Sequence, residues 1–266
     1  MYDQFNRKIN YLRISVTDRC NLRCEYCMPA EGVEPMRHED ILRFDEIVEF
    51  TRLAVERGVD KVRITGGEPL VRKGITNLIA LLSELKGIKD LAMTTNGILL
   101  DRFAQDLHSA GLNRVNVSLD TMDPEKYSKI TRGGNINDVF KGIEAAKVAG
   151  LTPIKLNCVI HKSSDEPDAQ AVKEYADANN LKIRFIHLMD LETGYFKPVE
   201  GGEGGNCSSC NRLRLTSDGY VNPCLFSTKS YSIRELGFEE ALDQSLASKP
   251  QKGGNNNEGH FYNIGG

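Results

Sequence analysis

Six of the seven cysteines in this 266-residue sequence fall into two tight triplets, one near each end of the chain. The first triplet has the spacing C-x3-C-x2-C and the second has the spacing C-x2-C-x13-C. An odd number of cysteines is not typical of a secreted disulfide framework, so clustered thiols favour metal ligation. The predicted metal ligands are Cys20, Cys24 and Cys27 in the first triplet and Cys207, Cys210 and Cys224 in the second.

The first triplet directly follows a predicted strand, at the end where barrel enzymes place their chemistry. Three thiolates can hold three irons of a [4Fe–4S] cluster and leave the fourth iron open for a ligand, unlike the four-cysteine sites of electron carriers. A zinc ion completed by His38 or by another cysteine is the alternative. The spacing favours the open cluster.

The second triplet spans a predicted hairpin. Asp218-Gly219 between alternating segments is a strong turn signal, and folding there brings Cys224 opposite the region of Leu213. This places Cys224 close to the loop that carries Cys207 and Cys210. From the spacing alone, zinc with a ligand from elsewhere in the chain is favoured over an iron–sulfur cluster.

The elements that must position these thiols follow a regular pattern. Short apolar runs alternate with amphipathic stretches through the first two thirds of the chain. We predict strands at Tyr11–Val16, Lys61–Thr65, Leu91–Thr95, Arg114–Leu119, Ile154–Ile160 and Ile183–Leu188. Helices are predicted between them, from Phe44 to Gly58 and at about Ile75–Lys86, Arg102–Ala110, Val139–Ala149 and Ala169–Ala178.

Six β/α units in series predict a parallel sheet with right-handed crossovers, and six are too few to close an eight-stranded barrel. We therefore predict the α/β class, as an open, partial (β/α)6 TIM-like barrel. The β/α pattern stops after Asp190, where a glycine-rich stretch leads to the second triplet. We predict that residues 1–189 form the partial barrel and that residues 190–266 form a small C-terminal module covering its lateral opening.

Alternation along the predicted strands sends polar side chains into the barrel. In one strand Val62 and Ile64 face the helices, which turns Arg63 inward together with its polar neighbours. The predicted inward-facing side chains are Arg13, Ser15, Thr17, Lys61, Arg63, Thr65, Asn116, Ser118, Asp120, Lys155, Asn157 and Arg184.

Buried charges are costly unless they are paired, so this lining requires a partner. An anionic ligand such as a polyphosphate is the simplest one. The alternatives are solvent at the strand ends, or internal pairing with Asp120 and Glu68. Arg212 and Arg214 also share one face, either as a solvated pair or as further anion donors.

The composition is that of a folded protein without a broad attraction to polyanions. Hydrophobic residues make up 40% of the chain, charged residues make up 27%, and the formal net charge is −3. These values exclude wholesale disorder and give no reason to expect binding to nucleic acid or anionic lipid. No apolar run approaches the roughly 18 residues of a membrane helix, and the first residues lack the apolar stretch of a secretion signal. We expect a cytoplasmic protein with no nucleic-acid or membrane partner.

The remaining chemistry-bearing residues receive no role. Cys158 lies on the helix-facing side of its predicted strand, so we expect it to be a packed core thiol. The five histidines show no ligand spacing.

The C-x3-C-x2-C motif, with Tyr26 before its last cysteine, resembles the signature of radical S-adenosylmethionine (SAM) enzymes. Gly66-Gly67-Glu68-Pro69 is similar to that superfamily's motif for the methionine amino group. The resemblance implies that the open iron chelates the methionyl amine and carboxylate, and that the glycines let the backbone approach closely. It further implies that electron transfer cleaves SAM to a 5′-deoxyadenosyl radical, which the barrel wall must protect.

The second triplet makes the resemblance more specific. With Asn-Arg-Leu-Arg-Leu-Thr-Ser-Asp-Gly between its cysteines, it is similar to the C-terminal motif of GTP 3′,8-cyclases, the first enzymes of molybdenum cofactor biosynthesis. Matching segments elsewhere are Leu-Arg-Ile-Ser-Val-Thr-Asp-Arg-Cys-Asn, Arg-Ile-Thr-Gly-Gly-Glu-Pro-Leu, Thr-Thr-Asn-Gly, Asn-Val-Ser-Leu-Asp and the closing Ile-Gly-Gly.

This second resemblance implies roles for the matching positions. The second triplet would hold a second [4Fe–4S] cluster whose open iron binds guanine, which makes 190–266 an iron–sulfur module. The SAM contacts would be Tyr26, Gly66, Gly67, Glu68, Ser118, Arg184 and Met189. The GTP contacts would be Arg13, Lys61, Arg63, Thr94, Lys155, Arg212 and Arg214. Catalysis would involve Arg212, Arg214 and the tail residues Gly265 and Gly266.

The implied reaction is abstraction of the ribose 3′ hydrogen of GTP, followed by attack of the carbon radical on guanine C8 to give 3′,8-cyclo-7,8-dihydro-GTP. The partners would be GTP and a low-potential electron donor, with a homodimer as one candidate assembly. The alternatives are a two-cluster radical SAM enzyme acting on another nucleotide or a peptide, and a metal-binding module without catalysis.

Two features depart from the family pattern. The link between Met189 and Cys207 is short and rich in glycine where the family usually has some tens of residues more. We therefore expect part of the wall over the substrate to be missing. His187 also stands where family members usually have Glu.

Overall fold

The computed structural model describes residues 1–257 and 261–264. Its strands are β1 (Tyr11–Ser15), β2 (Lys61–Thr65), β3 (Asp90–Thr95), β4 (Arg114–Ser118), β5 (Lys155–Ile160), β6 (Lys182–His187), β7 (Arg212–Leu215), β8 (Tyr220–Asn222) and β9 (Tyr231–Ser232). They form one sheet in the order β6-β5-β4-β3-β2-β1-β7-β8-β9. All pairs from β6 to β7 are parallel, and β7, β8 and β9 pair antiparallel.

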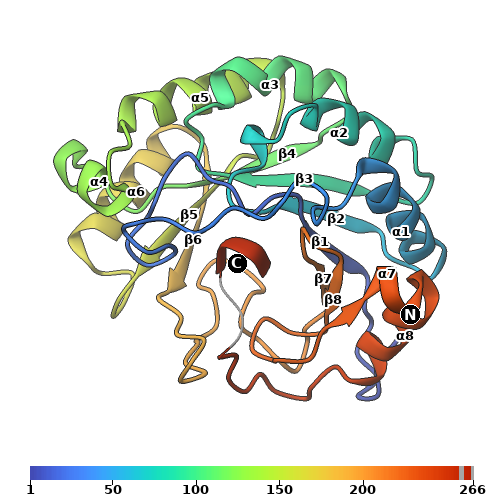
Figure 1. The fold of residues 1–266 in the computed structure, drawn as a ribbon. Coiled ribbons are helices and arrows are strands. Elements are labelled where there is room, and N and C mark those ends of the chain that lie inside the picture. The colour runs from blue at the N-terminus through green and yellow to red at the C-terminus, as the bar shows by residue number, and fades with distance from the viewer. Residues whose placement is uncertain (258–260, 265–266) are drawn as a thin grey trace.

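The helices of the repeating units cover the outer, convex face of the sheet (Figure 1). They are α1 (Phe44–Glu56), α2 (Ile75–Ser83), α3 (Leu100–Ser109), α4 (Pro124–Thr131), α5 (Ile136–Ala149) and α6 (Pro167–Ala178). A short 3-10 turn, η1 (Pro69–Val71), precedes α2, and α7 (Ile233–Leu236), α8 (Phe238–Ala247) and α9 (Phe261–Ile264) follow the last strands. The predicted α/β partial barrel is confirmed.

Local signals explain most of these elements. Asn135 caps the start of α5 by accepting from the backbone of Asn137, and Gly150 ends that helix in the left-handed conformation with φ 85°. Helix α4 is absent from the predicted helices, although Asp123 caps it and Pro124 occupies its first turn. The helix is short and mostly exposed, so its apolar periodicity is weak.

One core lies between the sheet and the outer helices. Leu12, Ile14, Val62 and Ile64 are almost fully buried in it, as the strand alternation predicts. Apolar residues of the last strands belong to the same core, among them Leu213 in β7. A separate, smaller cluster is formed by Leu191, Leu225 and Phe226.

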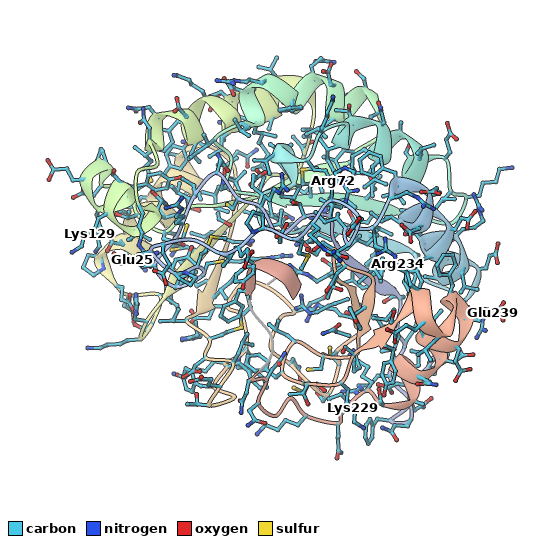
Figure 2. All side chains as sticks on the ribbon, viewed as in Figure 1. Glu25, Arg72, Lys129, Lys229, Arg234 and Glu239 are labelled. Atoms are coloured by element: carbon cyan, nitrogen blue, oxygen red, sulfur yellow. The ribbon has the colours of Figure 1, made fainter. Side chains whose placement is uncertain are left out.

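Charged side chains on the outer elements, such as Lys129, Lys229 and Glu239, project away from the molecule, whereas Arg72 lies between elements (Figure 2). The Arg72 guanidinium donates to the carbonyls of Val16 and Leu42 and stacks over the Phe44 ring at 4.5 Å. It thereby fastens the chain that leaves β1. In the described part of the chain, no helix is long and apolar enough to cross a membrane.

Candidate functional site

Arginines line up across the concave face of the sheet. The register places Arg13 of β1 beside Arg63 of β2 on one side and Arg214 of β7 on the other. Arg63 and Arg214 are buried, with 5% and 9% exposure. Like charges side by side in a sheet are destabilising, and burial increases that cost. This row of three arginines therefore indicates a site built for an anion.

The row faces a cavity of about 470 Å³, a size typical of small-molecule sites. Most of its lining strand residues lie at amino-terminal or middle positions of their strands, whereas Thr94, Ile186 and Arg214 lie nearer the carboxyl ends. Its polar lining includes Arg13, Lys61, Arg63, Thr94, Lys155, Asn157, Arg184, Arg212 and Arg214. The inward-facing cations predicted from alternation are thus confirmed as cavity residues.

Several polar atoms of this lining are buried without a hydrogen-bond partner among residues 1–257 and 261–264. They are Arg63 Nε, Arg184 Nε, Thr94 Oγ1 and Asn157 Oδ1. The ring of Tyr11 lies 5.4 Å from the Arg63 guanidinium and 5.8 Å from that of Arg212. Burial, followed by the charges of Arg184, Arg114 and Arg63, lowers the pKa of Lys155 to about 8. A polyanion would supply acceptors for the Nε groups of Arg63 and Arg184.

The two carboxylates suggested as internal partners are engaged elsewhere. Asp120 accepts from the Tyr26 hydroxyl and from the backbone of Val159. Both oxygens of Glu68 also accept from the chain. One lining cation not predicted from sequence, Arg114, does have an acidic partner, since it pairs with Asp90 at 2.5 Å.

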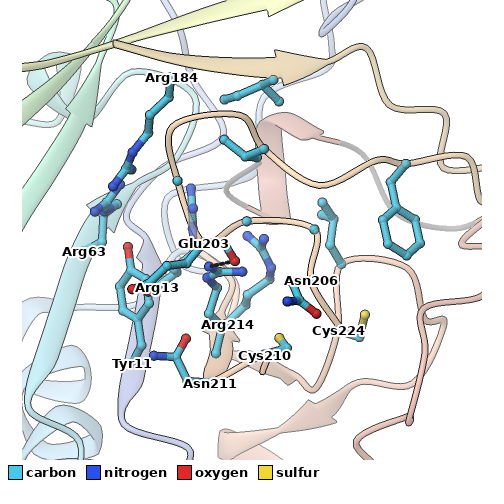
Figure 3. A pocket seen from close by; sticks show the side chains of 18 of the residues that line it. Tyr11, Arg13, Arg63, Arg184, Glu203, Asn206, Cys210, Asn211, Arg214 and Cys224 are labelled. Atoms are coloured by element: carbon cyan, nitrogen blue, oxygen red, sulfur yellow. Dashed lines mark hydrogen bonds between the residues drawn. The ribbon is translucent and has the colours of Figure 1, made fainter. Parts of the chain in front are cut away.

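The second triplet borders this cavity. Cys207, Cys210 and Cys224 are among its lining residues, and Figure 3 shows Cys210 and Cys224 opposite Arg63 and Arg184. The predicted hairpin is present: β7 pairs with β8 through Arg214 and Asn222, and Gly219 has φ 93° in the turn. Continued beyond the ladder, this register places Cys224 level with Arg212, one residue from the predicted position.

Charged groups flank these thiols. Burial opposes ionisation of Cys210, but the charge of Lys249 together with the backbone amide and the charge of Arg212 outweighs it, so the pKa of Cys210 is lowered. Burial raises the pKa of Cys224. Arg212, beside them, donates to the carbonyl of Glu203 at 3.1 Å.

The short link expected to leave a gap forms a wall of the cavity. Residues 201–206 line it, and Glu200 pairs with Phe185 of the β6 edge through two backbone hydrogen bonds of 3.0 Å. The Glu200 carboxylate also contacts His187 Nε2 at 3.2 Å and accepts from Ser164 at 2.6 Å. His187, which departs from the family pattern, thus anchors the link to the barrel.

The first triplet lies at the other end of the barrel, beyond the carboxyl end of β1. Gly66 and Gly67, beyond β2, pack directly on the loop that leads to Cys20. A Cβ on Gly66 would lie 2.6 Å from the Thr17 carbonyl oxygen, and one on Gly67 would lie 2.3 Å from that of Arg19. Only glycine fits, so the motif holds the cysteine loop against the barrel.

Glu68 continues this contact as a fully enclosed carboxylate. It accepts from the backbone amides of Leu70 and Asn96 and from the Thr95 hydroxyl, at 3.0, 2.7 and 2.8 Å. Asn96 in turn donates to Asn21, next to Cys20, at 2.8 Å. Burial raises the pKa of Glu68 to about 7 in spite of these donors. Glu68 thus acts on the chain rather than pointing into the cavity.

The thiols of the first triplet sit in an acidic setting. Burial raises the pKa of Cys20 to about 11 and those of Cys24 and Cys27 to about 12. The carboxylates of Glu68 and Asp120 add to the rise for Cys20 and Cys24 respectively. The hydroxyl of Tyr26, which lies between Cys24 and Cys27 in the sequence, donates to Asp120 at 2.7 Å. These thiols ionise when a cation takes the place of the proton.

Of the predicted SAM contacts, Arg184 and Met189 line the cavity, whereas Tyr26, Gly66, Gly67, Glu68 and Ser118 lie outside its lining. Helix α9 approaches both the region of the cavity and the region of the first triplet. Phe261 of α9 packs on the cluster that includes Phe226, and Tyr262 interacts electrostatically with Asp18 and Cys27. Figure 1 shows α9 inside the arc of the strands. Gly265 and Gly266 lie outside the described residues.

Comparison with known proteins explains this arrangement. Residues 14–176 match the family described as the radical SAM superfamily. The chain is 42% identical to the GTP 3′,8-cyclase of Thermodesulfovibrio yellowstonii over 305 aligned positions, covering 94% of this chain and 95% of the relative. The chain belongs to the GTP 3′,8-cyclase family of the radical SAM superfamily. Another member, from Moorella thermoacetica, is 43% identical over 85% of this chain and 84% of its own.

The fold agrees with this family. The structure of native anSMEcpe with bound AdoMet and Cp18Cys peptide matches with a TM-score of 0.66 at 17% identity, over 91% of this chain and 80% of that one. Streptococcus suis SuiB bound to S-adenosylmethionine matches with a TM-score of 0.65, also at 17% identity, over 94% of this chain and 66% of that one. The 305 positions aligned to the cyclase exceed the 266 residues of this chain, so that relative has segments that this chain lacks.

Membership of the superfamily implies a [4Fe–4S] cluster and SAM as cofactors. The donor set of the first triplet fits such a cluster, because three neighbouring thiols are the ligand type that iron–sulfur clusters use. In residues 1–257 and 261–264, no three His, Cys, Asp or Glu side chains form a group that could hold one metal ion. Cysteines of a four-iron cluster bind separate irons and need not converge on one point.

Proposed function

We propose that this chain is a radical SAM GTP 3′,8-cyclase that converts GTP to 3′,8-cyclo-7,8-dihydro-GTP in molybdenum cofactor biosynthesis. The observation that carries the proposal is the row of Arg63, Arg13 and Arg214 facing a cavity that the second cysteine triplet also lines. Membership of the cyclase family supplies the reaction.

The triphosphate would lie against the strand cations. Arg63 and Arg13 face the same space, and Lys155 and Lys61 add charge from neighbouring strands. Such charge-assisted hydrogen bonds to phosphate oxygens are stronger than neutral ones. The full set proposed for GTP is Arg13, Lys61, Arg63, Thr94, Lys155, Arg212 and Arg214.

Arg212 and Arg214 have a second proposed role. They extend from β7 beside the second triplet, between the strand cations and the thiols. Their guanidinium groups would stabilise the negative charge that the guanine acquires when the nitrogen-centred radical left by cyclisation takes up an electron from the donor. Gly265 and Gly266 follow α9, which lies inside the arc, and we propose that this tail reaches the reacting nucleotide.

We propose that the first triplet, Cys20, Cys24 and Cys27, binds the SAM-cleaving cluster, and that the second triplet, Cys207, Cys210 and Cys224, binds another [4Fe–4S] cluster next to the guanine. When bound, the first cluster would supply the electron that cleaves SAM to a 5′-deoxyadenosyl radical. Residues 1–189 would then provide the SAM site and residues 190–266 the second cluster. The proposed SAM residues are Tyr26, Gly66, Gly67, Glu68, Ser118, Arg184 and Met189.

Within that set the contacts favour two kinds of role. Gly66, Gly67 and Glu68 hold the loop of the first triplet, so they would position SAM through the cluster and the backbone. Arg184 and Met189 line the cavity, so they would contact SAM where it meets the nucleotide. Close positioning of the radical against one C–H bond would select the 3′ hydrogen.

A low-potential electron donor completes the proposed reaction, and a homodimer stays a prediction. We also propose that the enzyme works in the cytoplasm, a reducing compartment suited to its seven free cysteines.

The experiment that tests the activity is anaerobic incubation of the reconstituted protein with SAM, dithionite and GTP, followed by mass spectrometry. The proposal predicts 5′-deoxyadenosine together with a cyclised guanosine triphosphate. Release of 5′-deoxyadenosine with intact GTP would favour another nucleotide or a peptide as substrate. Release of neither product from an iron-loaded protein would contradict radical SAM activity.

A further inference from the structure

Lys249 is a buried cation at the second cysteine triplet. It follows α8 and is 2% exposed. Its ammonium donates to the carbonyls of Arg212 and Pro223, each at 2.7 Å, and its charge helps to lower the pKa of the neighbouring Cys210. One side chain therefore joins the start of β7 to the residue before Cys224, next to the thiol of Cys210.

A second cation completes this attachment from the N-terminal end of the chain. Arg7 donates to the carbonyls of Cys207 and Pro250, each at 2.7 Å. It thereby holds the segment that carries Lys249 against the Cys207 loop. The charge of Arg7 is balanced by Asp3, whose carboxylate lies 2.7 Å from Arg7 Nε.

Lys249 differs from Arg7 in the groups that can balance its charge. Once ionised, the thiols of Cys210 and Cys224 are the groups whose negative charge acts on Lys249, whereas the charge of Arg7 opposes its own. Backbone carbonyls solvate an ammonium but carry no net charge, and a buried cation without a counter-charge is strongly destabilising. The anion that would balance Lys249 is therefore one formed by the triplet itself.

We infer that Lys249 is a positioning residue of the second triplet, and that it supplies the counter-charge for the iron–sulfur cluster bound there. This inference rests on the second cluster proposed above. Reduction adds one electron to a cluster and makes it more negative, so a fixed cation beside it favours the reduced form. Lys249 thereby raises the reduction potential of the second cluster.

The test uses the full chain with Cys20, Cys24 and Cys27 replaced by alanine, so that one cluster remains. After anaerobic reconstitution, iron content is measured and the cluster is titrated with dithionite under electron paramagnetic resonance. About four irons per chain are expected. If this parent chain loads no iron, the second triplet binds no cluster. That result would contradict the proposed second cluster before any substitution of Lys249 is made, and it does not depend on GTP turnover.

In that parent chain, Lys249→Met is expected to shift the midpoint potential to more negative values. Lys249→Arg, which keeps the charge, is expected to stay near the parent value. Lys252→Met is the matched control, because Lys252 lies three residues further on and is exposed. An unchanged potential at full iron content in Lys249→Met would overturn the inference.

Loss of the cluster in a variant would also test the inference. If Lys249→Met folds but loads no iron while Lys249→Arg loads it, the cluster requires the charge and the inference stands. If both variants fail to load, packing rather than charge is what matters and the counter-charge role is refuted. If Lys249→Met does not fold, it is repeated with Cys207, Cys210 and Cys224 also replaced by alanine. Folding there supports the inference, and failure there overturns it.

Discussion

The two cysteine triplets offer the same ligand type in opposite electrostatic settings. The first lies beside the carboxylates of Glu68 and Asp120, and the pKa values of its thiols are raised. The second lies beside Lys249 and Arg212, where the pKa of Cys210 is lowered although burial raises that of Cys224. Two triplets with the same number of thiols therefore offer a cluster different surroundings. The setting of the first triplet disfavours added negative charge, and the setting of the second favours it.

The triplets also differ in how the chain holds them. Backbone packing holds the first, since Gly66 and Gly67 leave no room for a side chain against the Thr17–Arg19 loop. Charged side chains from both ends of the chain, Arg7 and Lys249, hold the second. The first is thus attached to the rigid barrel end, whereas the second depends on interactions that charge substitutions can remove.

The largest effects are expected from the thiols themselves. Cys24→Ala should reduce SAM cleavage to background, because three thiolates are needed to hold a cluster with one open iron. Cys210→Ala should abolish the cyclised product and leave SAM cleavage measurable. Chromatography of 5′-deoxyadenosine and product distinguishes them, with Cys158→Ala, a buried core thiol, as control. Equal loss of SAM cleavage in both variants would remove the division of roles.

Gly67→Ala should weaken iron binding at the first triplet alone. The added methyl would lie 2.3 Å from the Arg19 carbonyl oxygen, and overpacking of this kind costs about 1–3 kcal/mol. We expect less iron at the first triplet and unchanged iron at the second, measured in chains that retain only one triplet. Gly254→Ala is the control, because a Cβ there meets nothing within 4 Å. Full iron loading by Gly67→Ala would show that the loop can move freely.

Arg63→Ala should weaken GTP binding more than SAM binding. Charged hydrogen bonds contribute about 1.5–3 kcal/mol, so a loss of about 10- to 150-fold in GTP affinity is expected. Isothermal titration under argon measures both ligands, with the exposed Arg102→Ala as control. Equal losses for SAM and GTP would mean that Arg63 serves the whole barrel rather than the nucleotide.

The smallest expected effect is on the pH dependence of GTP binding. Burial lowers the pKa of Lys155 to about 8, so the free protein loses this charge as the pH rises through 8. Bound triphosphate raises that pKa again, so binding takes up a proton and affinity should fall about three- to tenfold from pH 7 to pH 9. Lys155→Met should flatten this profile. A profile equally steep in Lys155→Met would assign the titration to another group.

Strand alternation predicted the cation-lined cavity because it depends on local sequence. Apolar residues such as Val62 and Ile64 define the helix side, and the intervening Arg63 must then face inward. The attachment of the second triplet could not be predicted in this way. Arg7 and Cys207 are 200 positions apart, and neither Lys249 nor Arg7 belongs to a recognisable motif.

The short link illustrates a related limit. Its length predicted a missing wall, but the structure pairs Glu200 with the edge of β6 and lines one side of the cavity with the following glycines. The outcome depends on an unpaired strand edge and on His187 meeting Glu200, which are properties of the assembled barrel. Sequence spacing counts residues and does not show which edge they reach.

The most direct test of the two-triplet account is an iron anomalous map from anaerobic crystals of the reconstituted protein. The account predicts two separate peaks, each fitted by four irons. One would lie beyond the carboxyl end of β1, and the other would lie beside Lys249 at the border of the arginine-lined cavity. A peak at the first triplet alone, or a single ion at the second, would contradict it.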